Sequence, residues 1–418
     1  MDYDWIGYYF HNLHYYKDAK KQIMFKHLQV YLFIIFIATE LITPIVIKQR
    51  FYYKSKIFFY LLCITHAVMS IWFWILFIET KIYNGPFDDP ANLWNLMQIR
   101  GIMLAVTFPR SIIIITHFIN KFLKRNNWLS NAGLTIASVF FLIIAIGTFW
   151  GRFNVKTDNI EIKINGLHND LDGFRIVQIS DLHLASFYRN EKFLSKCVNM
   201  INSYNPDLLI NTGDFVSYGW REFSNFDTIL SKAHGKYGNF AILGNHDFGT
   251  YQPYLTETDK KNHILQINQK IKSSGYFILN DEHTIVNVKN AKIGIIGIAT
   301  MGRHSNLYHG NIDSVLKELD TVDLKIALTH DPNHFDMAIE GKTDIDITLS
   351  GHTHGMQMGI MTKNFKWSPS KYFYPHWNGL YVSEKQYHYV NRGLGTVGIP
   401  FRIWMPPEIT LITLKNEI

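Results

Sequence analysis

Residues 240–247 read Phe-Ala-Ile-Leu-Gly-Asn-His-Asp, an apolar run that passes directly into a glycine and three polar side chains. A short apolar run bounded in this way is typical of a buried strand. In sheets covered by helices, ligands collect beyond the carboxyl ends of the strands. The sequence therefore places Asn245, His246 and Asp247 where a ligand-binding site is expected.

Four further stretches repeat this pattern, and together they form five blocks in chain order. The blocks are Asp181-Leu182-His183, Gly213-Asp214, Gly244-Asn245-His246-Asp247, His330 and Gly351-His352-Thr353-His354. Carboxylate, imidazole and amide ligands together suit Mn, Fe or Zn. In an extended segment, Asp-x-His and His-x-His project both side chains to the same side, toward one metal cluster. The glycines let the backbone turn sharply and approach a ligand closely. The blocks predict a metal site.

Between the blocks, short β-rich runs alternate with helical stretches. Strands are predicted over residues 160–164, 173–180, 207–211, 240–243, 324–328 and 344–349. Helices are predicted over residues 191–204, 259–273 and 312–319. This alternation indicates an α/β domain in which helices cover a sheet.

The five blocks resemble those of the calcineurin-like metallophosphoesterase superfamily, from about Ile160 to the C-terminus. The tail, residues 391–395 (Asn-Arg-Gly-Leu-Gly) and 406–410 (Pro-Pro-Glu-Ile-Thr), is similar to the bacterial, membrane-anchored YkuE-like subgroup. The resemblance implies a β-sandwich flanked by helices, with two divalent metal ions (Mn, Fe or Zn) at one edge. It also implies hydrolysis of a phosphoester or pyrophosphate by metal-activated hydroxide.

The resemblance also implies a role for each polar residue. Asp181, His183 and His354 bind the first metal, Asn245, His330 and His352 bind the second, and Asp214 bridges both. His246 is the catalytic residue that faces the substrate phosphate and is not a ligand. Many relatives carry an acidic residue three positions after the bridging aspartate, where this chain has Ser217. We therefore expect the support for His246 to be weaker or to come from elsewhere.

Four apolar runs precede Trp150, at residues 28–47, 57–78, 102–119 and 132–150. At ~1.5 Å per residue, each is long enough to cross a hydrocarbon core of ~30 Å. They predict a transmembrane domain over residues 1–150, joined by a linker at 151–159 to a phosphoesterase domain over 160–418. A lone charge at mid-depth is costly, so we predict a contact between Glu40 and Arg110 with His66 nearby. A proton or ion pathway is the alternative.

Charge is divided unevenly along the chain. Residues 1–150 have a net charge of +7, whereas residues 151–418 have a net charge of zero. The neutral C-terminal part argues against nucleic acid as a partner. Loops 48–56 and 120–131 hold seven basic residues and no acidic ones, whereas loop 79–101 holds two basic residues. The positive-inside rule then places the catalytic domain outside the cytoplasm. Four lysines before the first run favour the opposite orientation: Lys17, Lys20, Lys21 and Lys26.

The sequence thus predicts an integral membrane hydrolase whose partners are the lipid bilayer and a phosphoester, lipid-linked or associated with the envelope. Two alternatives stay open: a membrane sensor or transporter with a regulatory phosphoesterase-like domain, and a binding module without catalysis.

Weaker features each have a plain structural alternative. Arg303, His304 and His309 form a polar loop that either meets a substrate or is solvated. Arg392 or Arg402 would either bind phosphate or form a structural salt bridge. The aromatic, basic segment 363–374 would either contact the bilayer, cap the site or pack normally.

Overall fold

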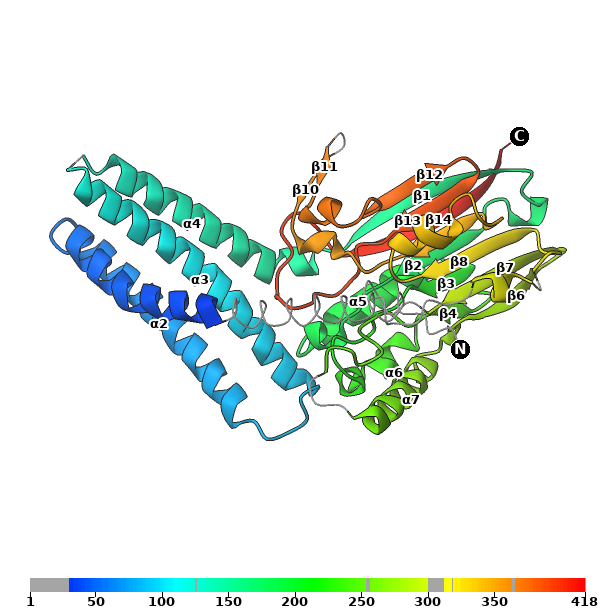
Figure 1. Cartoon of the computed structure of the whole chain (residues 1–418), viewed down its shortest axis with the longest axis horizontal. Coiled ribbons are helices and arrows are strands. Elements are labelled where there is room, and N and C mark those ends of the chain that lie inside the picture. Colours follow the sequence, from blue (N-terminus) through cyan, green and yellow to red (C-terminus); the bar gives the residue numbers. More distant parts are fainter. Residues whose placement is uncertain are drawn as a thin grey trace, which may run out of the picture. The chain divides into compact units, whose positions relative to one another are not determined.

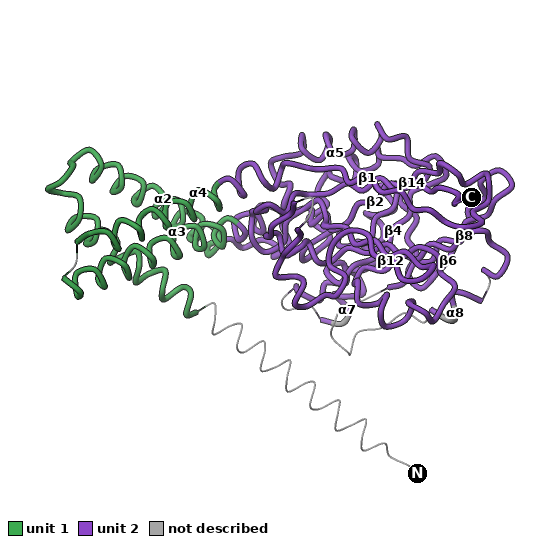
Figure 2. The backbone as a smooth tube through the Cα atoms, turned by 90° about the horizontal axis from the view of Figure 1, so that it is seen from above, with its two compact units in different colours: residues 1–82, 98–145 green, residues 83–97, 146–418 purple. Residues whose placement is uncertain are grey.

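The computed structural model describes residues 30–124, 126–252, 256–299, 312–317, 319–362 and 365–417. The chain forms two compact units, which interleave along the sequence (Figure 2). Unit 1 comprises Met1–Ile82 and Gln98–Ala145, and unit 2 comprises Tyr83–Met97 and Ile146–Ile418. The segment Tyr83–Met97, which the sequence analysis assigned to the membrane part, therefore belongs to the same unit as the phosphoesterase blocks.

Four helices are long and apolar enough to cross a membrane, as the four apolar runs predicted. They are Val30–Phe51, α2 (Lys56–Ile82), α3 (Pro90–Phe122) and α4 (Trp128–Phe149) (Figure 1). Helix α3 begins well before the predicted residue 102. Pro90 suits the first turn of a helix, and the Asp89 carboxylate caps it by accepting the backbone N–H groups of Ala91 and Asn92.

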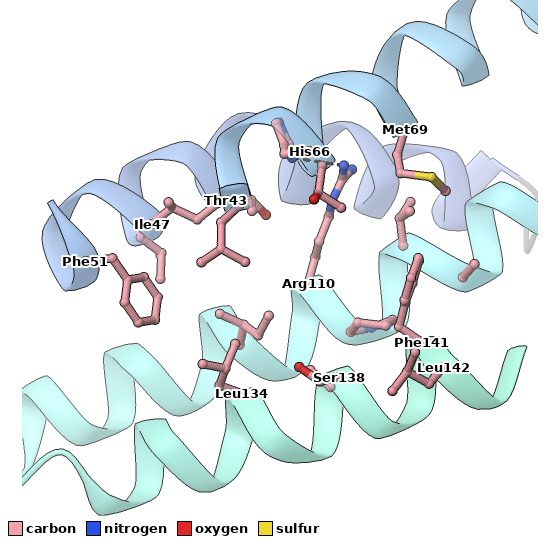
Figure 3. Close-up of a pocket in the computed structure, with 18 residues that line it drawn as sticks. Thr43, Ile47, Phe51, His66, Met69, Arg110, Leu134, Ser138, Phe141 and Leu142 are labelled. Atoms are coloured by element: carbon pink, nitrogen blue, oxygen red, sulfur yellow. Dashed lines mark hydrogen bonds between the residues drawn. The ribbon is translucent and has the colours of Figure 1, made fainter. Parts of the chain in front are cut away.

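The polar residues of the spans meet inside unit 1, as predicted. Arg110 of α3 forms an ion pair with Glu40 of the first described helix, and its Nη2 lies 2.9 Å from Nδ1 of His66 on α2. Figure 3 shows Arg110 reaching toward His66 beside a cavity of about 340 Å³ that is lined mainly by apolar side chains. Each charged group thus has a partner inside unit 1, which lowers the cost of placing it in a membrane span.

Removing Arg110 alone should destabilise the protein more than removing both Glu40 and Arg110. Arg110→Leu strands the Glu40 carboxylate, and breaking a buried ion pair costs roughly 3 kcal/mol. We expect Arg110→Leu to lower the melting temperature of the detergent-solubilised protein, and Glu40→Leu/Arg110→Leu to recover most of the loss. Lys121→Leu, which removes an exposed cation from the same helix, is the control. A double variant less stable than Arg110→Leu would contradict the coupling.

Unit 2 is built on two six-stranded sheets. The first has the order β1-β14-β2-β3-β4-β5, made of Lys156–Asn165, Glu408–Glu417, Arg175–Ile179, Leu208–Asn211, Asn239–Ala241 and Phe277–Ile278. The second has the order β12-β13-β9-β8-β7-β6, made of Gly379–Ser383, Gln386–Val390, Ile347–Ser350, Leu324–Thr329, Ala291–Ile298 and Glu282–Val288. A small hairpin pairs β10 (Ile360–Met361) with β11 (Lys366–Trp367).

Alternating side chains join the two sheets into a sandwich and attach the helices. In β2, Ile176 belongs to the core that the sheets share, whereas Val177 and Ile179 pack with residues of α5, α6 and α7. In β8, Ile326 points to the shared core and Ala327 to the layer that contains α8. The helices are α5 (Glu191–Ser203), α6 (Phe226–Leu230), α7 (Glu257–Ser273) and α8 (Ile312–Leu316). The predicted sandwich flanked by helices is confirmed.

The parallel strands set the position of the site. Strands β2, β3 and β4 are parallel neighbours in the first sheet, and β8 and β9 are parallel neighbours in the second. Each of the five predicted blocks begins within four residues after one of these strands. Carboxyl ends of parallel neighbours lie at the same edge of a sheet, so the topology gathers all five blocks.

Candidate metal centre

The predicted ligands converge into two clusters that share Asp214. In the first, His183 Nε2 lies 3.0 Å from His354 Nε2, and Asp181 Oδ1 lies 3.2 Å from the same His354 atom. Asp214 Oδ2 lies 3.6 Å from His183 Nε2. The geometry thus brings together acidic and imidazole groups that are buried at one end of the sandwich.

The second cluster contacts the same oxygen of Asp214. His330 Nε2 is 3.1 Å from Asp214 Oδ2, and His352 Nδ1 is 3.2 Å from His330 Nε2. Asn245 belongs to this region through its neighbour His246, whose backbone N–H donates to Asp214 Oδ1 at 3.0 Å. Asp214 Oδ2 therefore faces an imidazole nitrogen from each of the two clusters.

The local backbone differs from the extended form that the sequence analysis assumed. Asp181, His183, His352 and His354 have φ of 51°, 43°, 72° and 49°, in the left-handed region. That assumption is wrong, because the polypeptide turns sharply at both of these blocks. Such backbone costs of order 1–3 kcal/mol per residue and is concentrated at functional sites. The paired side chains meet because of these turns.

Glycine is needed where two blocks touch. Gly213 has φ of 98°, and a Cβ on it would lie 2.5 Å from the backbone nitrogen of Gly244. A Cβ on Gly244 would overlap Oδ1 of Asp214. The predicted close approach of the backbone is thus confirmed at the shared carboxylate.

Hydrogen bonds at Nδ1 orient two of the imidazole rings. His330 donates from Nδ1 to the carbonyl oxygen of Thr212 at 2.7 Å, which leaves Nε2 toward Asp214. His183 Nδ1 lies 3.2 Å from the Ser217 hydroxyl. Such outer contacts fix the tautomer and the ring direction of metal-binding histidines.

His246 receives its support from the backbone. Its Nδ1–H donates to the carbonyl oxygen of Ser217 at 2.6 Å, so a main-chain group occupies the place where many relatives have an acidic side chain. This meets the expectation that support comes from elsewhere. Tyr251 stacks on the ring, with centroids 4.2 Å apart.

Burial and mutual charge set the protonation of the site. Burial raises the pKa of Asp181, but His354 and His330 outweigh it and hold that pKa below its usual range. Burial lowers the pKa of His183 and of His352, which disfavours the charged form of both rings. Burial also lowers the pKa of His330, but Asp214 overrides this and raises it to about 10. Metal binding requires a neutral imidazole, so a cation here would compete with protonation of His330.

The donor set fits divalent cations. Two nitrogens each 2.0–2.1 Å from a tetrahedral Zn²⁺ lie about 3.3 Å apart. The separations of 3.0 Å in the His183–His354 pair and 3.2 Å in the His330–His352 pair are close to that value. Among the residues that the structure describes, none forms a hydrogen bond with the buried Asn245 Oδ1, so this oxygen has the capacity to bind a cation.

Two residues that the sequence analysis named without a specific role make contacts at the site. Asp247 accepts the backbone N–H groups of Asp214 and Gly244 at 2.8 and 2.9 Å, and so fixes the shared carboxylate. Tyr374 places its hydroxyl 2.8 Å from His352 Nε2. Tyr374 belongs to segment 363–374, and this contact favours the alternative in which that segment caps the site.

The phosphate-binding interpretation of two arginines is wrong. Arg392 is buried and pairs with Asp158 and Glu408 at 3.0 and 3.1 Å, which is the structural salt bridge named as the alternative. Arg402 is also buried, and it donates to several backbone carbonyl groups, including that of Gly395. Arg303, His304, His309 and Lys363 lie outside the described residues.

Comparison with known proteins agrees with this geometry. A family model described as calcineurin-like phosphoesterase matches residues 174–356. The metallophosphoesterase YkuE of Bacillus subtilis is 30% identical over 268 residues, which cover 63% of this chain and 86% of YkuE. The chain belongs to the calcineurin-like metallophosphoesterase family.

Two other relatives of this metallophosphoesterase are informative. A transmembrane protein with metallophosphoesterase domain from Danio rerio is 29% identical over 286 residues, 66% of this chain and 62% of its own length. UDP-2,3-diacylglucosamine pyrophosphatase LpxG of Chlamydia muridarum is 29% identical over 287 residues, 59% of this chain and 85% of LpxG. The chain is accordingly a phosphoester hydrolase of this family, with four helices suited to span a membrane.

The shared carboxylate gives a direct test of the metal centre. Asp214→Asn removes the charge that faces both clusters, so we expect the purified metallophosphoesterase to lose metal from both. Elemental analysis of protein prepared without chelator should fall from close to two ions per chain to well below one. Asp172→Asn, at a half-exposed carboxylate that pairs with Lys415, should leave the content unchanged. Full metal content and full activity in Asp214→Asn would refute the assignment.

Proposed function

We propose that this protein is a membrane-anchored phosphoesterase with a dinuclear metal centre, in which Asp214 is the bridging ligand. Asp181, His183 and His354 would hold one divalent cation, and Asn245, His330 and His352 the other. The observation that carries this proposal is the position of Asp214 between two sets of ligands, 3.6 Å from His183 and 3.1 Å from His330. When bound, such a pair of cations supplies an activated water nucleophile and neutralises the charge that develops on the phosphoryl oxygens.

The chain's own residues would then complete the reaction. His246 keeps a proton on Nδ1, where it donates to the Ser217 carbonyl group, so Nε2 is the atom free to face the substrate. In that position it can hydrogen-bond a phosphoryl oxygen or give a proton to the leaving oxygen. Asp247 holds Asp214 in place through its backbone N–H group, and the Ser217 carbonyl group holds the His246 ring. In this role neither Asp247 nor Ser217 contacts the substrate.

The substrate we propose is a lipid-linked phosphoester or pyrophosphate. Two observations support this choice: four helices suit a membrane span, and the related LpxG is named for a pyrophosphatase reaction on a diacylated nucleotide sugar. The alternative of a transporter has less support in the part of the chain that the structure describes. There the three polar residues Glu40, His66 and Arg110 satisfy one another, which is the arrangement of a structural contact.

Activity should depend on His246 separately from metal. We expect the purified full-length protein, loaded with Mn, Zn or Fe, to hydrolyse model phosphomonoesters, phosphodiesters or a diacylated sugar pyrophosphate. His246→Ala should keep its metal and lose ~10²–10⁴-fold in rate, the usual worth of a positioned acid or base. The exposed His234→Ala is the matched control. Loss of metal in step with activity would make His246 a ligand, and inactivity of the unsubstituted protein in every assay would refute the function.

We also propose that the catalytic unit lies outside the cytoplasm. The segment Tyr83–Met97 follows the second helix, and the domain beyond Ile146 follows the fourth, yet both belong to unit 2. Both must therefore be on one side of the membrane, which agrees with four spans. The opposite connections 48–56 and 120–131 carry the basic residues that favour the cytoplasm.

Protease accessibility checks this orientation. Protease added to intact spheroplasts of a bacterium that expresses the chain should digest the region beyond Gly151. A cytoplasmic marker protein should survive in the same sample. Protection of that region until the membrane is broken would place the active site in the cytoplasm.

A further inference from the structure

A buried carboxylate joins the segment between α2 and α3 to loop 217–222, which lies beside the site histidines. Asp88 belongs to the Tyr83–Met97 part of unit 2 and has no exposed surface. Its carboxylate accepts hydrogen bonds from Nη1 and from the backbone nitrogen of Arg221 at 3.0 and 3.3 Å. The neighbouring Phe87 packs edge-on against Tyr218, with ring centroids 5.1 Å apart. A carboxylate is buried in this way only where a cation and N–H donors compensate it.

The loop that Asp88 contacts forms hydrogen bonds with two histidines of the site. Within this loop, residues 217–222, the Ser217 carbonyl group accepts from His246 Nδ1 at 2.6 Å. The Ser217 hydroxyl lies 3.2 Å from His183 Nδ1. A shift of Ser217 would therefore move the ring of His246 first, because that ring has the shorter bond.

Two carboxylates hold the loop from opposite sides. Glu222 folds back and accepts the backbone N–H groups of Ser217, Tyr218 and Gly219 at 2.6–3.1 Å. Asp88 closes the other side, where a Cβ on Gly219 would overlap the Asp88 side chain. The loop thus contacts Asp88 as closely as its backbone permits.

The segment that carries Asp88 is itself well ordered by local contacts. Asp89 caps α3, and Asn92 donates from Nδ2 to the carbonyl oxygen of Phe87 at 2.9 Å. One turn further along α3, the guanidinium of Arg189 lies 5.8 Å from the ring centroid of Trp94. These contacts let the segment act as a fixed support.

We propose that Asp88 is a positioning residue of the phosphoesterase site, which holds His246 in place through Arg221 and loop 217–222. This proposal rests on the proposed role of His246. Asp88 would not touch the substrate or a metal, so its loss should affect the rate constant of the reaction and leave substrate binding and metal content intact.

The test compares Asp88→Asn with Asp89→Asn in the full-length, metal-loaded protein. Both variants remove one negative charge from adjacent positions, and asparagine at 89 can still cap α3. We expect Asp88→Asn to lower kcat ~10–100-fold, the scale of a misplacement of about 1 Å, with KM within about twofold. Asp89→Asn should match the unsubstituted protein. Arg221→Gln breaks the same contact from the loop side and should reproduce the effect, and the double variant should be no worse than the more damaging single one.

Hydrogen exchange separates this proposal from the proposed function. In Asp88→Asn, backbone amides of residues 217–222 should exchange faster while those of β2 and β8 do not. An unchanged kcat in both Asp88→Asn and Arg221→Gln would overturn the positioning role, as would loss of metal in step with activity. If the unsubstituted protein hydrolyses no phosphoester, the proposed function fails and the positioning role fails with it. Faster exchange would then still establish the contact between the segment and the loop.

Discussion

The structure of the catalytic unit depends on one buried carboxylate. Asp214 is almost fully enclosed, and an enclosed negative charge persists only where positive charge or N–H donors surround it. Here His183 and His330 face one of its oxygens, and the backbone of His246 donates to the other. The same demand accounts for two glycines, because Gly213 and Gly244 leave room for the blocks on either side of Asp214 to approach each other.

This constraint links the two sheets. Asp214 follows β3 of the first sheet, whereas His330 and His352 follow β8 and β9 of the second. The two sets of strand ends face each other only if the sheets pack with their apolar faces together, as the shared core of Ile176 and Ile326 requires. Hydrophobic burial therefore fixes the separation of the ligands, and the polar groups add the direction of each ring.

The strand ends and the polar blocks that follow them were predictable because their signal is local. An apolar run followed by polar residues located β3, β4 and β8 within two residues. The left-handed backbone at Asp181 and His354 was not predictable, because only tertiary contacts stabilise a conformation that most residues avoid. Contacts across long stretches of sequence were equally hidden, such as that of Tyr374 with His352 and the pairing of β1 with β14. Their composition is ordinary, and only the fold joins them.

The assignment of the segment Tyr83–Met97 to unit 2 was not predictable for a related reason. Read alone, it is a polar connection between two apolar runs, and its acidic residues contribute little to topology. In the structure the chain enters unit 2 there, returns to the membrane helices, and enters unit 2 again at Ile146. Both ends of the segment are held by helices, so little conformational entropy remains to be lost when Asp88 meets Arg221. Loop 217–222 is thus held on the Asp88 side by a segment whose own conformation is set by local contacts, the Asp89 cap of α3 and the hydrogen bond from Asn92 to Phe87.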